Sequence, residues 1–279
     1  MNYTSVIMSV KMVIKSKENK FFKWVKELTE TKKRKKEKKF LLEGFTFVKE
    51  TLEKFPELID CIILGEGFTK SEKGKEFLKF LKERDFPHYI FSSSLIKEIS
   101  STETPQGIIA VIKQPEYQDI SSFLKKEPNI VILLEEIQEP NNVGAIIRVA
   151  LAVGASAVFY TKGTADPYSL KSVRASAVAI LYLPVIRIEE IKEAITMLKE
   201  NGFQIIATLP KGGENLFKTN FSQKSAVILG NEARGVSEKT KNLADKLITI
   251  PMSKKAQSLN VAVSAGIILY HILYKNKIF

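Results

Sequence analysis

The chain has 279 residues, of which 44% are hydrophobic and 27% are charged, a balance typical of a globular protein with about two domains. No uncharged apolar run reaches the ~18 residues of a transmembrane helix. Lys11 and Lys15 interrupt the apolar N-terminal stretch, and no small-residue cleavage site follows it, so it does not resemble a secretory signal. The single cysteine, Cys61, excludes an intramolecular disulfide and a cysteine-based zinc site, and two histidines are too few for a histidine-rich metal site. We therefore expect a soluble, cytoplasmic protein with no metal ion.

Positive charge is concentrated at the start of the chain. The net charge is +12, and residues 1–40 contribute +9 of it, with seven cations among the eight positions 32–39. Such a run binds polyanions by releasing their counterions, so RNA or DNA is the partner that charge alone favours. A solvated helix face, a solubilising arm or an anionic membrane surface are the alternatives. The candidate RNA-binding residues are Lys32, Lys33, Arg34, Lys35 and Lys36.

Residues 1–115 predict a small α/β domain. Amphipathic patterns predict helices over 20–30 and 45–55, and short apolar runs predict strands over 61–65, 88–92 and 107–113. The polar stretch 116–128, bounded by Pro115 and Pro128, predicts a linker.

Residues 129–279 predict a second α/β domain. Near-continuous apolar runs at 131–136, 157–161, 183–188, 204–209, 226–230 and 247–252 alternate with helical or loop segments. This pattern is typical of a parallel sheet covered on both faces. Because such sheets bind ligands beyond the carboxyl ends of their strands, the residues that follow these runs are the candidate site.

The first cluster follows the strand at 131–136. Asn142 is suited to cap a helix that carries an apolar stripe and stops at Gly154. Arg148 is a lone cation among small and apolar side chains of that helix. It is either an exposed arginine with a packed stem or a residue that faces a ligand, since arginine is suited to bidentate phosphate contacts.

The second and third clusters follow the last two strands of the domain. After the strand at 226–230 come Asn231, Glu232 and Arg234, then a glycine that permits a close backbone approach, and a helix that Ser237 could cap; an ordinary turn is the alternative. After the strand at 247–252, a polar loop leads to a long helix predicted to be capped by Ser258, with the small residues Ala262, Ala265 and Gly266. These small residues favour either core packing or a dimer interface.

Together the clusters resemble the three signature motifs of the SpoU (TrmH-like) branch of the SPOUT methyltransferases. The first resembles the family's N-x-G-x-x-x-R at 142–148, the second its L-G-x-E-x-x-G at 229–235, and the third its I-P-M and S-L-N-V at 250–261. The resemblance covers residues 129–279. It implies a C-terminal trefoil knot, a pocket for S-adenosylmethionine, a homodimer, and methyl transfer to a ribose 2′-hydroxyl of RNA.

The N-terminal block resembles the RNA-binding domain, similar to ribosomal protein L30e, that precedes the catalytic domain in many ribosomal-RNA members. The matching residues are Ser16 and Asn19, Arg34, Phe40 to Gly44, and Ser101 to Gly107. This resemblance favours ribosomal RNA, with 23S ribosomal RNA expected and transfer RNA as the alternative.

The resemblance also implies roles for individual residues. It makes Arg148 the catalytic residue, together with Asn142, Glu232, Ser258 and Asn260. A guanidinium is a donor and a poor base, so we expect Arg148 to fix the phosphate and the hydroxyl while the proton is lost during attack. S-adenosylmethionine would be held mostly by backbone groups around Leu229, Gly230, Ile250, Met252 and Leu259.

Three positions depart from the family pattern. Lys254 stands where many members have glycine, Ala262 where they have serine, and Val178 where glycine often follows Ala175-Ser176-Ala177. Lys254 could contact RNA or the carboxylate of S-adenosylmethionine.

Two other classes of function fit the sequence less well. A non-catalytic dimeric RNA-binding protein is disfavoured because the residues matching the catalytic set are all present. A dinucleotide-dependent oxidoreductase would need G-x-G-x-x-G, but Gly65 and Gly67 are followed by Lys70 at the last glycine position. No phosphate-binding P-loop is present in the sequence.

Overall fold

The computed structural model describes residues 13–117, 119–125 and 127–277. The chain divides into two compact units, the first of Met1–Pro115 with Tyr168–Arg174 and the second of Glu116–Pro167 with Ala175–Phe279. We call them the N-terminal unit and the C-terminal unit.

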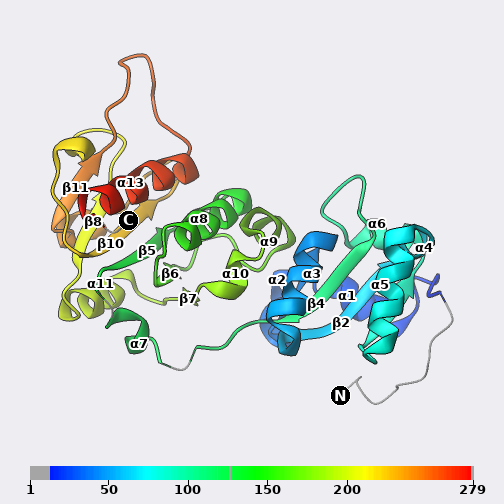
Figure 1. Ribbon diagram of the computed structural model, residues 1–279. Coiled ribbons are helices and arrows are strands. Elements are labelled where there is room, and N and C mark those ends of the chain that lie inside the picture. The colour runs from blue at the N-terminus through cyan, green and yellow to red at the C-terminus, as the bar shows by residue number, and fades with distance from the viewer. Residues whose placement is uncertain (1–12, 118, 126, 278–279) are drawn as a thin grey trace. The chain divides into compact units, whose positions relative to one another are not determined.

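The N-terminal unit is built on a four-stranded mixed sheet with the order β1-β4-β2-β3 (Figure 1). β4 is antiparallel to both β1 and β2, and β2 is parallel to β3. Its strands are β1 (Lys39–Glu43), β2 (Ile59–Gly65), β3 (His88–Phe91) and β4 (Ile108–Lys113). Its helices are α1 (Lys20–Glu27), α2 (Thr31–Glu37), α3 (Phe45–Lys54), α4 (Glu66–Lys70), α5 (Glu72–Glu83) and α6 (Ser93–Ile99), with the 3-10 helix η2 (Pro56–Leu58). The two helices and three strands predicted for this block are confirmed as α1, α3, β2, β3 and β4. The strand β1 and the helices α2, α4, α5 and α6 are not among the predicted elements.

Local chemistry explains where α1 begins and what it buries. The Asn19 side chain accepts hydrogen bonds from the backbone N–H groups of Phe21 and Phe22, which have no partner within the helix. α1 is amphipathic and buries Phe22 and Val25 against the sheet. Cys61 is buried in the same core, and this burial raises the pKa of its thiol.

The C-terminal unit is built on a seven-stranded sheet with the order β7-β6-β5-β10-β8-β11-β9 (Figure 1). Every neighbouring pair is parallel, which confirms the predicted parallel α/β sheet. Its strands are β5 (Asn129–Glu135), β6 (Ala157–Tyr160), β7 (Val185–Arg187), β8 (Gln204–Thr208), β9 (Glu214–Asn215), β10 (Lys224–Gly230) and β11 (Lys246–Thr249). All seven residues of β5 are buried, as expected for a central strand covered on both faces.

Helices supply both layers of this unit. α8 (Pro140–Ala152) packs against α13 (Val261–Lys275), and α13 also contacts β10. α11 (Ile191–Glu200) packs its apolar face into the core formed by β5, β6, β8 and β10. The remaining helices of this unit are α7 (Ser121–Leu124), α10 (Ala179–Tyr182) and α12 (Glu238–Leu243), with the 3-10 helix η3 (Leu216–Lys218). Most of α9 (Leu170–Ser176) belongs to the segment Tyr168–Arg174 of the N-terminal unit.

The stretch predicted as a linker is partly structured. α7 lies within residues 116–128, and its Leu124 is fully buried in the core of the C-terminal unit. A single large apolar side chain in a polar stretch gives too little periodicity for a sequence prediction.

Helix starts were predicted less well than the helices themselves. Glu139, not Asn142, caps α8, because Pro140 takes the first helical position and the Glu139 carboxylate accepts the Asn141 N–H. Asn260, not Ser258, caps α13 and accepts from the N–H groups of Ala262 and Val263. The predicted cap at Ser237 is confirmed, since its side chain accepts from Thr240 N.

Candidate functional site

The carboxyl ends of four parallel strands bring the three sequence clusters together. β5 and β10 are neighbours in register, with Gly230 opposite Glu135. β8 and β11 follow on the other side of β10. The loops that leave these strands therefore start from one edge of the sheet, where open α/β folds bind ligands.

These loops enclose a cavity of about 550 Å³, a size typical of a pocket for an organic ligand. It is bounded by the ends of β8, β10 and β11, by the loop before α13 and by α13 itself. Nine of the ten residues that the family resemblance assigned to catalysis or cofactor binding line it: Asn142, Leu229, Gly230, Glu232, Ile250, Met252, Ser258, Leu259 and Asn260. The tenth, Arg148, does not.

Gly230 ends β10 where the following loop turns back over the strand. A Cβ atom at this position would lie 2.2 Å from the backbone carbon of Gly235, closer than any side chain permits. Gly235 itself has φ +69°, a conformation that favours glycine. Both glycines therefore let the backbone of the second cluster form one wall of the cavity.

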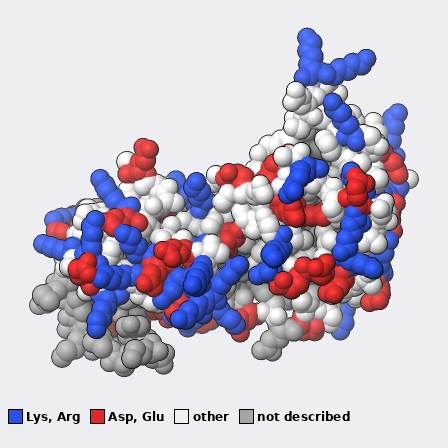
Figure 2. Space-filling view, turned by 180° about the vertical axis from the view of Figure 1, so that it is seen from behind, with Lys and Arg blue, Asp and Glu red and all other residues white. Residues whose placement is uncertain are grey.

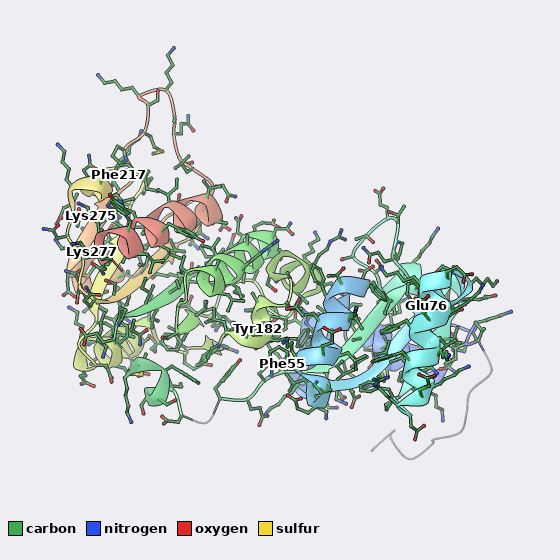
Figure 3. The ribbon with its side chains drawn as sticks, in the orientation of Figure 1. Phe55, Glu76, Tyr182, Phe217, Lys275 and Lys277 are labelled. Atoms are coloured by element: carbon green, nitrogen blue, oxygen red, sulfur yellow. The ribbon has the colours of Figure 1, made fainter. Side chains whose placement is uncertain are left out.

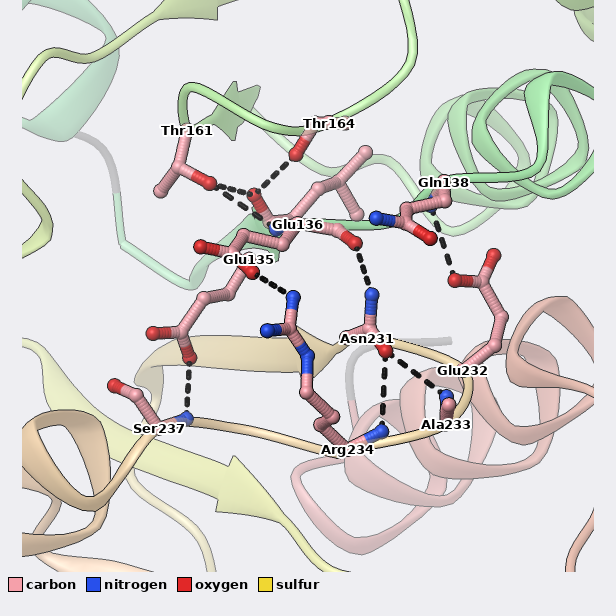
Figure 4. A network of polar contacts seen from close by, with 11 residues as sticks. Glu135, Glu136, Gln138, Thr161, Thr164, Asn231, Glu232, Ala233, Arg234 and Ser237 are labelled. Carbon is pink, nitrogen blue, oxygen red and sulfur yellow. Dashed lines mark hydrogen bonds and ion pairs between the residues drawn. The ribbon is translucent and has the colours of Figure 1, made fainter.

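The Glu232 carboxylate binds the segment that enters α8. It accepts hydrogen bonds from Gln138 N at 3.0 Å, Glu139 N at 3.1 Å and Asn142 Nδ2 at 3.0 Å (Figure 4 shows the Gln138 contact). Partial burial opposes ionisation of Glu232, but these donors outweigh it and lower the pKa of the carboxyl. Glu232 thus holds the loop before α8.

Asn142 connects the first cluster to the third. Its Oδ1 accepts from Asn260 Nδ2 at 2.9 Å, while its Nδ2 donates to Glu232. Asn260 in turn caps α13 through its own Oδ1. A continuous set of hydrogen bonds therefore links Asn142, Glu232 and Asn260, three of the predicted catalytic residues, near the starts of α8 and α13.

A second set of contacts, not predicted from the sequence, fixes the loop after β10. Asn231 Nδ2 donates to Glu136 O at 2.9 Å, and its Oδ1 accepts from the N–H groups of Ala233 and Arg234 (Figure 4). Arg234 and Glu136 form an ion pair at 2.6 Å. Asn231 stands beside Glu232 in the second motif, so its position was visible in the sequence, whereas its partner 95 positions away was not.

Glu135 anchors the far end of the same loop. This carboxylate is 7% exposed and accepts from Ser237 N at 3.2 Å and from Thr240 Oγ1 at 3.0 Å. A buried carboxylate needs such donors to offset its lost hydration. The loop is thus tied at both ends to the strand next to it.

Arg148 and Ser258 are placed differently from the rest of the predicted set. Arg148 is exposed on α8, and its guanidinium has no hydrogen bond or ion pair with any described residue. Ser258 lines the cavity with an exposed side chain, and its hydroxyl likewise has no partner among the described residues. Both polar groups are available to a ligand.

The basic run forms α2 in the N-terminal unit. Lys32, Lys35 and Lys36 are exposed and make no ion pair with the described residues, while Lys33 pairs with two glutamates. Arg34 is only 3% exposed, and its guanidinium donates to the Leu28 and Thr29 carbonyls and to Thr31 Oγ1. This placement corrects the expectation that Arg34 is part of a surface for RNA, since its donors are used inside the fold.

Two absences hold for the described residues, 13–277 with the gaps given above. No helix in these segments is long and apolar enough to cross a membrane. No group of three or more histidine, cysteine or acidic side chains in them is placed to hold a metal ion.

Two family models match the chain, and together they span most of it. The model described as the SpoU rRNA Methylase family matches residues 129–270. The model described as the MRM3-like substrate binding domain matches residues 19–110.

Known proteins resemble the chain over nearly their whole length. The 23S rRNA (guanosine(2553)-2′-O)-methyltransferase RlmP of Bacillus subtilis is 31% identical, with 94% of this chain and 99% of that protein covered. The AdoMet-bound rRNA methyltransferase of Sinorhizobium meliloti has a TM-score of 0.81 at 25% identity, covering 94% of this chain and 97% of that one. The AdoMet complex of the SpoU methyltransferase AviRb of Streptomyces viridochromogenes has a TM-score of 0.81 at 26% identity, covering 93% and 98%.

Proposed function

Because the chain belongs to the SpoU rRNA methylase family, we propose that it transfers a methyl group from S-adenosylmethionine to a ribose 2′-hydroxyl of 23S ribosomal RNA. One observation carries this proposal: the three sequence clusters converge on a single cavity at the carboxyl edge of the parallel sheet. The likeness to RlmP, which acts on a guanosine of 23S ribosomal RNA, supports the choice of substrate.

The cavity fits S-adenosylmethionine in size and in the chemistry of its walls. Its volume is about 550 Å³, within the range of pockets for ligands of this size. Leu229, Ile250, Met252 and Leu259 offer apolar contacts for the adenine ring, and Leu259 is 39% exposed, so its side chain is accessible to a ligand. Gly230 also lines this cavity.

In this site the chain's own residues would orient the reactants. S-adenosylmethionine, when bound, supplies a methyl group carried on a positively charged sulfur. On transfer, the ribose oxygen would gain the O–C bond, the C–S bond would break, and the hydroxyl proton would pass to solvent. Asn142 and Ser258 would position the ribose, and holding both reactants in line can contribute about 7–11 kcal/mol to the acceleration.

Arg148 would act on the substrate as a cation and a donor. Its five N–H groups cannot accept a proton at neutral pH, but they can hold a phosphate in a bidentate contact and stabilise the oxygen as it loses its proton. Glu232 and Asn260 would position Asn142 through the hydrogen bonds described above.

We further propose that the active form is a homodimer in which Arg148 completes the cavity of the partner subunit. Arg148 does not line the cavity of its own chain, and its guanidinium has no partner among the described residues. α13 also exposes Val263, Tyr270 and Tyr274, which are 50–79% exposed and recur at helical spacing. Sedimentation should give twice the chain mass, and Tyr270→Glu should reduce both the mass and the activity.

The remaining family features belong to the same proposal. We propose that the chain after β10 is threaded as a trefoil knot, and that residues 129–279 form the methyltransferase domain. Residues 1–115 would form an L30e-like domain that binds the substrate RNA, with Lys32, Lys33, Lys35 and Lys36 on its surface and residues 116–128 as the connection. The reaction would take place in the cytoplasm, where bacterial ribosomal RNA is made.

Methyl transfer from radiolabelled S-adenosylmethionine tests the proposed function. Unmodified transcripts of 23S ribosomal RNA and of transfer RNA are supplied separately. Label in 23S ribosomal RNA is expected. Label in transfer RNA alone would show that transfer RNA, and not 23S ribosomal RNA, is the substrate. Label in neither RNA would overturn the proposal.

A further inference from the structure

A second cavity, of about 370 Å³, adjoins the one described above. Its walls come from the loop after β8, from the end of β11 and from the loop that leads to α13. Pro210, Ile250 and Met252 line both cavities. A group bound in the second cavity would therefore lie next to whatever occupies the first.

The charge of the second cavity is entirely positive. Lys211 and Lys254 line it together with uncharged residues, and no carboxylate does. Lys255 follows directly, and the segment 250–260 contains no acidic residue. In the residues that the structure describes, none of these three ammonium groups has a hydrogen bond or ion pair.

Four other lysines of this unit are each paired with a carboxylate. The paired groups, with their N–O distances, are Lys199 with Asp245 at 2.7 Å, Lys239 with Glu190 at 3.3 Å, Lys241 with Glu238 at 2.6 Å and Lys246 with Glu214 at 3.3 Å. In contrast, Lys211 and Lys254 line the same cavity, and no carboxylate among the described residues pairs with either of them.

The loop between β11 and α13 carries this charge away from the body of the unit. Figure 3 shows that the loop projects and that side chains ending in nitrogen lie at its far end. Figure 2 shows the same projection from behind, with Lys and Arg atoms at its tip and no acidic atoms beside them. Lys254 and Lys255 lie in this loop and are exposed. Exposed cations of this kind can reach a large ligand lying across the cavity.

We propose that Lys211 and Lys254 form a binding site for a backbone phosphate of the RNA strand that contains the methylated nucleotide. The inference rests on the proposed function, since it places this phosphate beside the cofactor cavity. Neighbouring cations repel each other, and a polyanion relieves this repulsion while releasing its condensed counterions. Lysine, a flexible point charge, suits a phosphate whose position varies with the RNA conformation.

The salt dependence of RNA binding tests the proposal. The double variant Lys211→Gln/Lys254→Gln is compared with the matched variant Lys192→Gln/Lys239→Gln, which removes two exposed charges from α11 and α12. Affinity for an unmodified 23S ribosomal RNA transcript is measured between about 50 and 200 mM salt. If each lysine neutralises one phosphate, the log–log slope of the first variant falls by about 1.4 to 1.8, and that of the matched variant stays unchanged.

A second measurement separates RNA from the cofactor as the bound anion. Calorimetry compares S-adenosylmethionine with 5′-methylthioadenosine, which lacks the carboxylate. The proposal predicts that the double variant binds both as the wild type does, which also shows that it is folded. A selective loss of affinity for S-adenosylmethionine would assign the lysines to its carboxylate and overturn the phosphate site.

Failure of the phosphate site and failure of the proposed function give different results. An unchanged salt slope in a chain that still methylates RNA would remove the phosphate site and leave the proposed function intact. A wild-type chain that methylates no RNA would remove the proposed function and the phosphate site with it.

Discussion

Asn142 Nδ2 donates to Glu232 Oε1 at 3.0 Å across 90 positions of the chain. The bond joins the start of α8 to the loop after β10, and the opposite end of the Asn142 amide accepts from Asn260. Because an amide offers both a donor and an acceptor, asparagine can join a carboxylate on one side to a second amide on the other. This explains why all three motifs meet at this residue.

Replacing Arg148 by alanine should abolish methyl transfer and leave S-adenosylmethionine binding unchanged. The side chain is exposed and lies outside the cavity of its own chain, so its loss leaves the cavity walls intact. Transfer assays and calorimetry on the same preparation check this. Arg148→Lys keeps the charge but not the bidentate geometry and should recover little activity; wild-type rates in Arg148→Ala would refute the assignment.

Replacing Glu232 by glutamine should loosen the loop before α8. A glutamine amide has one acceptor oxygen and brings a donor to face N–H groups that also donate. We expect a loss of about 1 kcal/mol in the free energy of unfolding and weaker S-adenosylmethionine binding. Urea unfolding and calorimetry measure these two effects, with Glu238→Gln on the exposed first turn of α12 as the control. Equal binding by both variants would contradict the role given to Glu232.

The lowered pKa of Glu232 predicts a loss of stability in acid. Burial opposes its ionisation, but the backbone and Asn142 donors outweigh burial, so the folded-state pKa lies below its unfolded value of about 4.3. The carboxylate's contribution is fully present above that unfolded pKa and is lost as the pH falls through the folded-state pKa. The difference in unfolding free energy between wild type and Glu232→Gln should therefore be constant near neutrality and shrink below about pH 4. A difference that did not vary with pH would show that ionisation is irrelevant.

Arg34 and its neighbours on α2 should respond differently to substitution. Arg34→Ala removes donors from two carbonyls and a hydroxyl in a buried position, so we expect a loss of about 2–4 kcal/mol in stability. Lys36→Ala, on the exposed face, should change stability by less than about 0.5 kcal/mol. Denaturant unfolding of both variants checks the contrast. Equal effects would mean that the Arg34 contacts carry no net stabilisation.

The exposed lysines of α2 should govern the salt dependence of RNA binding. Neutralising Lys32, Lys35 and Lys36 together should lower the log–log slope by about 2.1 to 2.7 if each contacts one phosphate. The matched variant neutralises three lysines of the same unit that are paired with carboxylates: Lys49, Lys70 and Lys75. A slope equal to that of wild type would reduce α2 to a solubilising segment.

Six of the seven strands of the C-terminal unit could be predicted because each overlaps an apolar run of five or six residues. β5 and β10 are each seven residues long and almost wholly buried, which leaves a clear signal. β9 has two residues and β1 follows directly on the lysine run, so neither produces a run that stands out. Short strands depend on their neighbours in the sheet more than on their own composition.

The sequence predicted the motif residues of the site, but it did not predict the hydrogen bonds and ion pair that join residues far apart in the chain. Leu229, Ile250 and Met252 were identifiable because they stand in the family motifs that the sequence resembles, at 229–235 and 250–261. The contacts of Asn231 and Arg234 with Glu136 cross more than 90 positions, and no local pattern encodes them. Ser258 and Asn260 are both good caps, and only the backbone geometry at Asn260 decides between them.

The position of the methyl group on the RNA tests the central claim most directly. The 23S ribosomal RNA transcript, after reaction with S-adenosylmethionine and the wild-type chain, is digested to nucleosides and analysed by mass spectrometry, with a parallel sample treated with alkali. The account predicts a single 2′-O-methylated nucleoside and a dinucleotide that resists alkali at the modified linkage. A methyl group on a base, with every linkage cleaved by alkali, would contradict it.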